Sequence, residues 1–166
     1  HWGAIVATTT SEANIDLVKS LGADIVIDYK KEDFETILKD YDVVLNSQDA
    51  KTLEKSQKVL KTGGKVISIS GPPDPDFGKE INANWFLKII LKFLSAGIRK
   101  KAKRLGVSFS FLFMRAEGNQ LGQITKLIES GVIKPVLDKV FPFEQTNEAM
   151  FYVETGRARG KVVVKM

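Results

Sequence analysis

Runs of β-branched residues alternate with helix-like sequence along most of this chain. Five such runs end in small or polar residues, at 4–10, 24–28, 42–46, 65–70 and 109–114. Strands that alternate with helices at this spacing predict βαβ units, which build a parallel sheet with helices on both faces. Ligands of such sheets bind at the C-terminal ends of the strands. The pattern therefore predicts an α/β fold with a ligand site at one edge of its sheet.

Polar or small residues follow the first four runs, as a nucleotide site requires. They are Thr8-Thr9-Thr10-Ser11, Asp28-Tyr29-Lys30, Asn46-Ser47-Gln48 and Ser70-Gly71-Pro72-Pro73. Because the C-terminal ends of parallel strands meet at the same edge, we expect these segments to share one side of the sheet.

The composition excludes several classes of protein. Cysteine is absent and the single histidine is His1, so the chain offers neither a disulfide nor a self-contained zinc site. The net charge of +5 is modest, whereas a nucleic-acid-binding protein usually concentrates more positive charge on one face. The sequence shows no charged leader with an apolar signal core, and no apolar run long enough to span a bilayer. We therefore expect a soluble, cytoplasmic protein of single-domain size that binds no nucleic acid.

Helix and turn signals predict the connections between the strands. Ser11 is the expected N-cap of a helix over 12–21, and Gly22 stands where a helix end favours positive φ. The three prolines in 71–75 predict a loop. The other expected elements are a short helix near 34–38, a helix near 53–60 ended by Gly63-Gly64, a helix at 120–130 with a break at Gly131, an extended piece at 136–143, a helix at 147–154 capped by Thr146, and a strand at 161–166.

Residues 85–104 combine a broad apolar surface with a basic end. The apolar residues are Trp85, Phe86, Ile89, Ile90, Phe93, Leu94 and Ile98, and the cations are Arg99, Lys100, Lys101, Lys103 and Arg104. Helices that lie on anionic membranes show this combination. A core or subunit-contact helix gives the same pattern when its basic end is solvated and complements the helix dipole. The sequence favours the second interpretation, so we expect a helix whose apolar residues pack against protein.

Three stretches of the chain, 5–35, 40–71 and 140–166, resemble a known family. The resemblance rests on motifs in a fixed order: Leu-Gly-Ala-Asp at 21–24 before a strand ending in Asp-Tyr, Gly-Gly-Lys at 63–65, and Gly-x-x-x-Gly-Lys at 156–161. In this order they resemble the cofactor-binding half of the medium-chain dehydrogenase/reductase superfamily. Its NADPH-dependent quinone oxidoreductase and alcohol dehydrogenase-like branch is the most similar part.

The resemblance implies a Rossmann-like, doubly wound parallel sheet. The family's first strand and glycine-rich phosphate loop would lie upstream of His1, and so would a GroES-like catalytic domain. We therefore expect residues 1–135 to form a partial cofactor-binding domain and residues 136–166 to return to the catalytic domain. Strand 4–10 should lie beside 24–28, and strand 42–46 beside 65–70.

A missing first strand would leave two strand edges without partners. Each orphaned backbone group costs about 1–3 kcal/mol when it is buried. Residues upstream of His1, direct pairing of the two halves, or a strand from a partner chain would fill the gap. We expect an isolated chain to be poorly stable or to form homo-oligomers.

The end of the first strand predicts the cofactor. An acidic residue there would favour the 2′-hydroxyl of NAD, whereas neutral hydroxyls with a nearby donor accept the 2′-phosphate of NADP. The chain has Thr9, Thr10 and Ser11 at this point. The resemblance adds Tyr29 to the 2′-phosphate site and places Asn14 where the family has a lysine, with Lys30 as a substitute. The alternative is that the threonines only form a strand and cap a helix, while Tyr29 packs.

The resemblance implies further cofactor contacts at the other strand ends. Asn46 and Ser47 match the ribose side, although Gln48-Asp49 replaces the usual Val-Gly. Ser70 and Gly71 match the turn on the nicotinamide side, and Phe111 and Phe113 match the strand that faces the carboxamide. Lys161 matches a basic position near the phosphates. The aromatic residues are otherwise plain core, and Lys161 is otherwise a solvated lysine at a strand start.

The function implied by the resemblance is that of an NADP-dependent oxidoreductase. Its substrate would be a quinone, an enone or another small carbonyl compound, and the catalytic residues would lie outside this chain. Two alternatives stay open: a zinc-type alcohol dehydrogenase with its zinc ligands in the catalytic domain, and a non-catalytic binding or membrane-surface module that uses 85–104.

Overall fold

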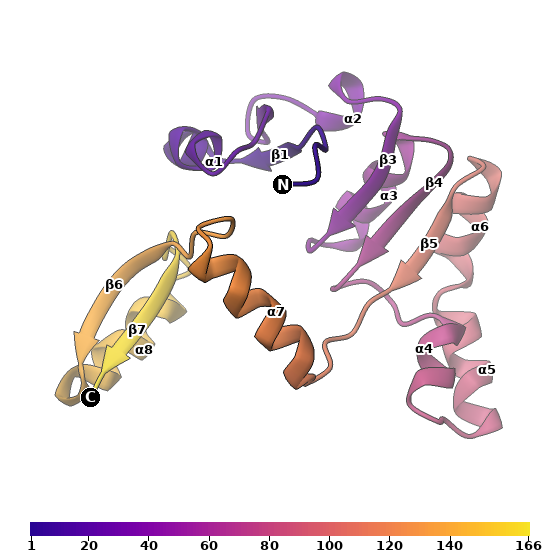
Figure 1. Ribbon diagram of the computed structural model, residues 1–166. Coiled ribbons are helices and arrows are strands. Elements are labelled where there is room, and N and C mark those ends of the chain that lie inside the picture. The colour runs from indigo at the N-terminus through magenta and orange to yellow at the C-terminus, as the bar shows by residue number, and fades with distance from the viewer. The chain divides into compact units, whose positions relative to one another are not determined.

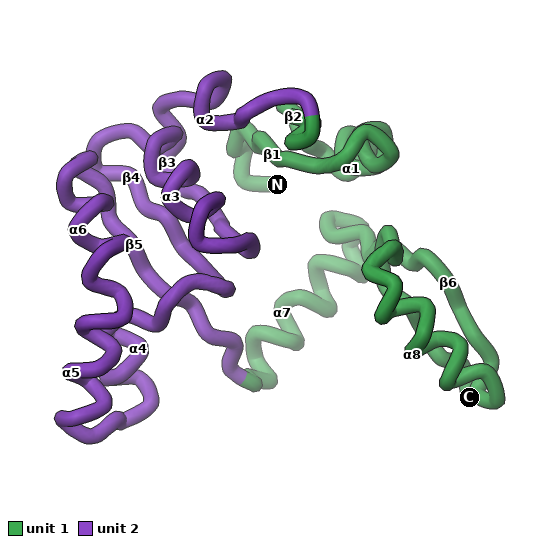
Figure 2. Tube along the Cα trace, turned by 180° about the vertical axis from the view of Figure 1, so that it is seen from behind, with its two compact units in different colours: residues 1–30, 116–166 green, residues 31–115 purple.

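The computed structural model describes residues 1–166, which divide into two compact units (Figure 2). Unit 1 comprises residues 1–30 and 116–166, and unit 2 comprises residues 31–115. The strands form three separate sheets, ordered β1-β2, β3-β4-β5 and β6-β7, and every ladder is parallel (Figure 1). The predicted parallel α/β class is therefore confirmed. The boundary expected at residue 135 concerns contacts with a further domain and stays a prediction.

The first sheet, in unit 1, pairs β1 (Ala7–Thr10) with β2 (Ile25–Asp28). The expected neighbour relation of 4–10 and 24–28 is confirmed, with Thr10 opposite Asp28. The connection holds η1 (Glu12–Asn14) and α1 (Ile15–Ser20), as the helix signals predict. Gly22 has a φ of +102°, the left-handed conformation expected after the helix. Ser11 precedes η1, but its side chain makes no capping hydrogen bond.

The remaining elements of unit 1 are α7 (Gly118–Glu129), β6 (Leu137–Pro142), η2 (Phe143–Gln145), α8 (Thr146–Glu154) and β7 (Lys161–Lys165). Thr146 is not the N-cap: it is the first residue of α8, and its hydroxyl donates to the Phe143 carbonyl because η2 runs directly into the helix.

The structure explains why position 160, in the Gly-x-x-x-Gly-Lys motif, is a glycine. A Cβ there would lie 2.5 Å from the Val136 carbonyl oxygen, which accepts from the Lys161 N–H.

Unit 2 holds the larger sheet. Its strands are β3 (Tyr41–Asn46), β4 (Leu60–Ser68) and β5 (Ser108–Phe111), and its helices are α2 (Phe34–Ile37), α3 (Ala50–Lys58), α4 (Pro75–Glu80), α5 (Trp85–Leu94) and α6 (Ala96–Arg104). β3 lies beside β4 as predicted. The two halves of the chain do not pair directly, since β1 and β3 are edge strands of separate sheets.

The core of unit 2 lies between the sheet and the helices α3 and α6. Its buried residues are Leu53, Leu60, Val66, Ala102 and Val107. Burying a side chain as large as Leu53 contributes about 1.5–3 kcal/mol. The other side of β3 is different: Val43 is 55% exposed and Leu45 is 65% exposed. Within unit 2, helices therefore cover one face of the sheet and leave the other open.

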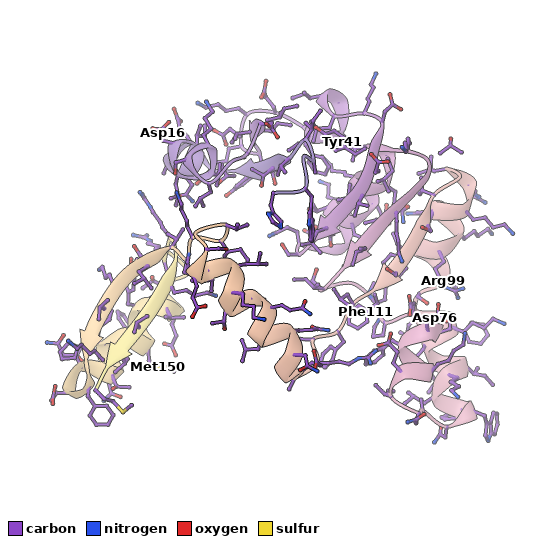
Figure 3. All side chains as sticks on the ribbon, in the orientation of Figure 1. Asp16, Tyr41, Asp76, Arg99, Phe111 and Met150 are labelled. Atoms are coloured by element: carbon purple, nitrogen blue, oxygen red, sulfur yellow. The ribbon has the colours of Figure 1, made fainter.

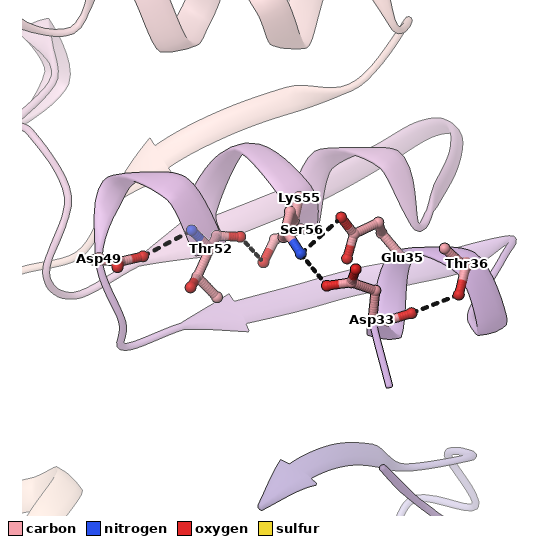
Figure 4. Close-up of polar contacts among 7 residues, drawn as sticks. All are labelled: Asp33, Glu35, Thr36, Asp49, Thr52, Lys55 and Ser56. Atoms are coloured by element: carbon pink, nitrogen blue, oxygen red, sulfur yellow. Dashed lines mark hydrogen bonds and ion pairs between the residues drawn. The ribbon is translucent and has the colours of Figure 1, made fainter. Parts of the chain in front are cut away.

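Polar contacts join α2 and α3, the helices that precede β3 and β4 (Figure 4). The Asp49 carboxylate caps α3 by accepting from the Thr52 N–H at 2.8 Å. Lys55 binds Asp33 and, at 3.0 Å, Glu35, which joins α3 to α2. The hydrogen bond and charge of Lys55 lower the pKa of Asp33, and the same pairing raises the pKa of Lys55. Asp33 is exposed, so its bond to Lys55 contributes little to stability, whereas the Glu35 side chain is only 11% exposed.

Several expected boundaries need correction. β1 begins at Ala7, β4 ends at Ser68, and β5 ends at Phe111. The helix before β4 ends at Lys58, and β4 begins at Leu60 and runs through Gly63-Gly64. The glycines mark a bulge, because the register shifts between Tyr41 and Val43. The proline loop ends at Asp74, since Pro75 opens α4, where a proline loses no helical hydrogen bond.

Residues 85–104 are helical as predicted, but they form two helices that meet at Ser95. The expectation that the apolar residues pack against protein holds for Leu91, which is 5% exposed and contacts α4 near Gly78. It is wrong for the outer face of α5, where Trp85 is 74% and Phe93 is 75% exposed. No helix in the chain has the length and apolar character needed to cross a membrane.

Candidate cofactor-binding site

The C-terminal ends of β3 and β4 form a hydrogen-bonded group of polar side chains in unit 2. The side-chain oxygen Oδ1 of Asn46 accepts from the Ser68 hydroxyl at 3.1 Å and from the Ser70 hydroxyl at 3.4 Å. Ser70 also donates to the Gln48 carbonyl. Asn46 and Ser68 are 3% and 0% exposed, so buried hydrogen bonds fix this edge. Two of the predicted site residues, Asn46 and Ser70, therefore lie together; Ser47 follows Asn46 and is exposed.

Gly71 fits this edge because it has no side chain. Its N–H donates to Ser68 Oγ at 2.8 Å. A Cβ at Gly71 would lie 2.8 Å from that oxygen and 3.0 Å from Leu53 Cδ2. A larger residue would displace the Ser68 hydroxyl, which links Gly71 to Asn46. The close approach of backbone to side chain explains the glycine at this turn.

Asp74 joins the end of β4 to the end of β5. It is 3% exposed, and its two carboxylate oxygens accept from two backbone amides. Oδ1 accepts from the Phe77 N–H at 2.9 Å, which caps α4, and Oδ2 accepts from the Phe111 N–H at 3.1 Å. Leu112 N–H donates to the Ser68 carbonyl at 2.9 Å. The backbone amides of Phe111 and Leu112 are therefore already used within the protein.

An aromatic cluster completes this end of the sheet. Phe77 of α4 lies edge-on to Phe111 at a ring distance of 5.3 Å and lies 5.6 Å from Phe113. Phe111 sits at the end of β5 (Figure 3). Phe111 is part of the packed cluster, which matches the core interpretation, whereas Phe113 is 57% exposed. Phe113 is thus the more exposed aromatic residue of this pair, and its role in cofactor binding stays a prediction.

Sequence reasoning missed Ser68, Asp74 and Phe77. Asp74 followed by Pro75 is a helix-start signal, with an N-cap side chain and a proline at the first helical position. That signal was available, but it predicts only the cap. The bond to Phe111 links residues 37 positions apart, and no local pattern predicts it.

The predicted hydroxyl cluster lies at the end of the β1-β2 sheet in unit 1. Tyr29 N–H donates to the Thr10 carbonyl at 3.2 Å, so both residues stand at the same edge. Tyr29 is 59% exposed, and Thr9 and Lys30 are exposed beside it; Ser11 follows Thr10 directly. Asp28, opposite Thr10, is buried and accepts from the Lys30 N–H at 3.0 Å. Hydroxyls, a phenol and a lysine therefore lie at this strand end, and the Asp28 carboxylate beside them accepts from a backbone amide.

Lys161 begins β7 in the third sheet and is exposed. Its backbone N–H donates to the Val136 carbonyl at 2.7 Å, and no contact joins its side chain to the other predicted residues. Its role near the phosphates stays a prediction.

The residues of the chain do not fit a zinc ion. Zinc requires cysteine, histidine or carboxylate ligands in a closed set. The chain has no cysteine, its single histidine is His1, and no three histidine, aspartate or glutamate residues gather where they could bind a metal.

Comparison with known proteins gives a family match over most of the chain. The family model described as "Zinc-binding dehydrogenase" matches residues 21–164. Human mitochondrial NAD(P)H oxidoreductase RTN4IP1 (Homo sapiens) is 32% identical over 186 residues, which cover 99% of this chain and 42% of that protein. The chloroplastic NADPH-dependent alkenal/one oxidoreductase of Arabidopsis thaliana is 35% identical over 164 residues, covering 96% of this chain and 33% of that protein.

Solved structures agree on the fold. The quinone oxidoreductase from Coxiella burnetii superposes with a TM-score of 0.75 at 23% identity, over 99% of this chain and 45% of that one. At this identity the likeness concerns the fold alone. The chain spans less than half the length of each of these three proteins.

Proposed function

Because the chain belongs to the zinc-binding dehydrogenase family of the medium-chain dehydrogenase/reductase superfamily, we propose that it forms the cofactor-binding part of an NADPH-dependent oxidoreductase. The substrate class we propose is an α,β-unsaturated carbonyl compound or a quinone. The name of the alkenal/one oxidoreductase among the similar proteins supports the unsaturated carbonyl compounds of this class. The cytoplasmic location stays a prediction, because the names of two similar proteins are mitochondrial and chloroplastic.

The main observation behind the cofactor choice is the end of β1. Thr9, Thr10 and Ser11 close this strand without a carboxylate of their own, and Tyr29 is held beside Thr10 by a backbone hydrogen bond. Hydroxyl donors and a cation suit a 2′-phosphate, which a carboxylate at the strand end would repel. Because Asn14 stands at the position where the family has a lysine, we assign the positive charge to Lys30.

The residues of unit 2 are suited to orient the rest of the cofactor. Asn46 Oδ1 already accepts from the Ser68 hydroxyl, so its amide nitrogen is the group left to donate to a ribose oxygen. Gly71 lets the turn after β4 pack closely against Ser68 and Leu53, which holds this turn beside Asn46. The amides of Phe111 and Leu112 are used by Asp74 and Ser68, which leaves Phe113 and the segment after it to face the carboxamide.

When bound, the nicotinamide cofactor supplies the hydride, and the protein supplies binding and orientation. The residues of this chain would therefore set cofactor affinity and preference. The groups that contact the substrate are not assigned among them.

Steady-state kinetics of the full-length gene product test the proposal. We expect kcat/KM for NADPH to exceed that for NADH with an enone or a quinone as acceptor. The double substitution Thr10→Ala and Tyr29→Phe should reduce this preference by about tenfold. A buried hydrogen bond to a charged group contributes about 1.5–3 kcal/mol, and solvent exposure at this strand end lowers that contribution.

A matched control is Tyr152→Phe, which makes the same chemical change on α8 at a tyrosine that binds Asp138. It should leave the NADPH to NADH ratio unchanged. Equal kcat/KM values for the two cofactors in the wild-type protein would rule out the 2′-phosphate assignment. No turnover of any enone or quinone would rule out the substrate class.

A further inference from the structure

The outer face of α5 is a continuous apolar surface that nothing in unit 2 covers. Six large side chains on this face are exposed: Trp85, Phe86, Ile89, Ile90, Phe93 and Leu94. They recur at helical spacing and cover about half of the helix circumference. Leu91, on the opposite side, is buried against α4. We refer to these six residues as the α5 face.

Positive charge surrounds the α5 face. Every charged residue from 81 to 116 is a lysine or an arginine. Lys88 and Lys92 lie on α5 itself, at the border of the α5 face, and α6 adds Arg99, Lys100, Lys101, Lys103 and Arg104. The segment itself carries no carboxylate, but Lys101 binds Glu54 of α3 and Arg115 binds Glu80 of α4, so the charges of these two cations are balanced within unit 2.

The junction between the two helices holds the apolar and basic parts in a fixed relation. Ser95 is fully buried, and its hydroxyl donates to the Leu91 carbonyl at 2.9 Å. Arg99 of α6, visible in Figure 3, donates to Ser95 Oγ at 3.1 Å and to the Lys92 carbonyl at 2.9 Å. Ala102 packs α6 into the core of unit 2. The protein therefore presents an apolar helix and a basic helix together from one rigid support.

We propose that α5 and α6 form a docking surface for a bilayer that contains anionic phospholipids. An apolar helix with aromatic residues and a lysine border can lie in the interface, with Trp85 and the phenylalanines among the acyl chains and the cations at the phosphates. The helix would lie on the membrane, since it is too short to cross one.

Charge also argues against a second copy of the chain as the occupant. A symmetric dimer contact would bring the same surface of two protomers together. The cations of α5 and α6 would then oppose one another, and the carboxylates of α3 and α4, Glu54, Asp76 and Glu80, are already paired with Lys101, Lys79 and Arg115. An anionic lipid surface instead complements both the apolar face and its border.

Vesicle flotation of the full-length gene product tests this proposal independently of enzymatic activity. We expect the protein to float with vesicles of phosphatidylcholine and phosphatidylglycerol, but not with phosphatidylcholine alone, and to be released by high salt. Phe93→Ser should weaken binding about tenfold, because it removes a large apolar side chain from the lipid contact. The triple substitution of Lys100, Lys103 and Arg104 by glutamine should weaken it on the order of a hundredfold.

Matched variants distinguish binding through the α5 face from nonspecific hydrophobic binding and from an effect of net charge. Phe151→Ser changes the same residue type on α8 at similar exposure, 70% against 75% for Phe93, and should leave flotation unchanged. Replacement of Lys19, Lys126 and Lys134 by glutamine removes the same charge elsewhere and should reduce flotation far less.

Several outcomes would overturn the proposal. One is absence of flotation with the anionic vesicles, and another is equal loss of binding in Phe93→Ser and Phe151→Ser. A third is unchanged flotation of Phe93→Ser together with loss of a homo-oligomer, loss of an acidic protein partner, or a lower melting temperature. That result would assign the α5 face to a protein contact.

Discussion

Replacing Asp74 with alanine tests whether one buried carboxylate holds the end of β5 in place. The substitution removes the acceptor of two backbone N–H groups, those of Phe77 and Phe111. Loss of the α4 cap costs about 1 kcal/mol. The Phe111 N–H would also lose its partner in a buried site, which lowers the free energy of unfolding by about a further 1–3 kcal/mol. We therefore expect the free energy of unfolding to fall by about 2–4 kcal/mol.

Asp49→Ala is the matched control. Asp49 also caps a helix of unit 2, where its carboxylate accepts from the Thr52 N–H, but it is exposed and its partners lie within the first turn of that helix. Its replacement should cost about 1 kcal/mol. The difference between the two variants, about 1–3 kcal/mol, then measures the bond to Phe111.

Urea denaturation of the full-length gene product, with the m-value compared between variants, gives both free energies. Asp74→Ser is a useful third variant, because serine can cap α4 but is too short to serve both amides. It should recover about 1 kcal/mol of the loss. Equal destabilisation by Asp74→Ala and Asp49→Ala would refute the reasoning. If the proposed function is right, Asp74→Ala should also weaken NADPH binding more than Asp49→Ala does.

Three further outcomes follow from the geometry. Gly71→Ala should destabilise the protein by about 1–3 kcal/mol and raise the KM for NADPH, because its Cβ would lie 2.8 Å from Ser68 Oγ; an unchanged urea midpoint would contradict the close contact. The hydrogen bonds from the Tyr152 hydroxyl and from the Arg159 N–H lower the pKa of Asp138 below its usual 3.8. The ionised carboxylate therefore stabilises the fold above pH 3.8, and this stabilisation is lost as the pH falls through the lowered pKa. Asp138→Asn should therefore be less stable than wild type at pH 6 and approach it under acid conditions, as thermal melts across this range would show; a constant difference would exclude the linkage. Chelators should leave the melting temperature of the chain unchanged, because it lacks a zinc ligand set, and stoichiometric zinc found by elemental analysis of the 166-residue chain would contradict this.

The amino-acid sequence alone determined the class of fold and the strand neighbours. Runs of β-branched residues, each followed by a helix signal, are local patterns, and they predicted the parallel α/β class. The resemblance to the family supplied the strand neighbours, β1 beside β2 and β3 beside β4. The sequence also marked Asn46, Ser70 and Gly71 as members of one edge, since residues at the ends of neighbouring parallel strands must meet there.

Tertiary structure decided which groups fix that edge and which surfaces stay open. Ser68 and Asp74 bind residues 22 and 37 positions away in the chain, so only the folded arrangement reveals them. The same holds for α5. Its apolar residues predict burial by composition, but a helix buries only the side that finds a partner, and here Leu91 meets α4 while Trp85 and Phe93 face outward. Periodicity specifies that a helix has an apolar face; the packing of its neighbours determines whether protein covers that face.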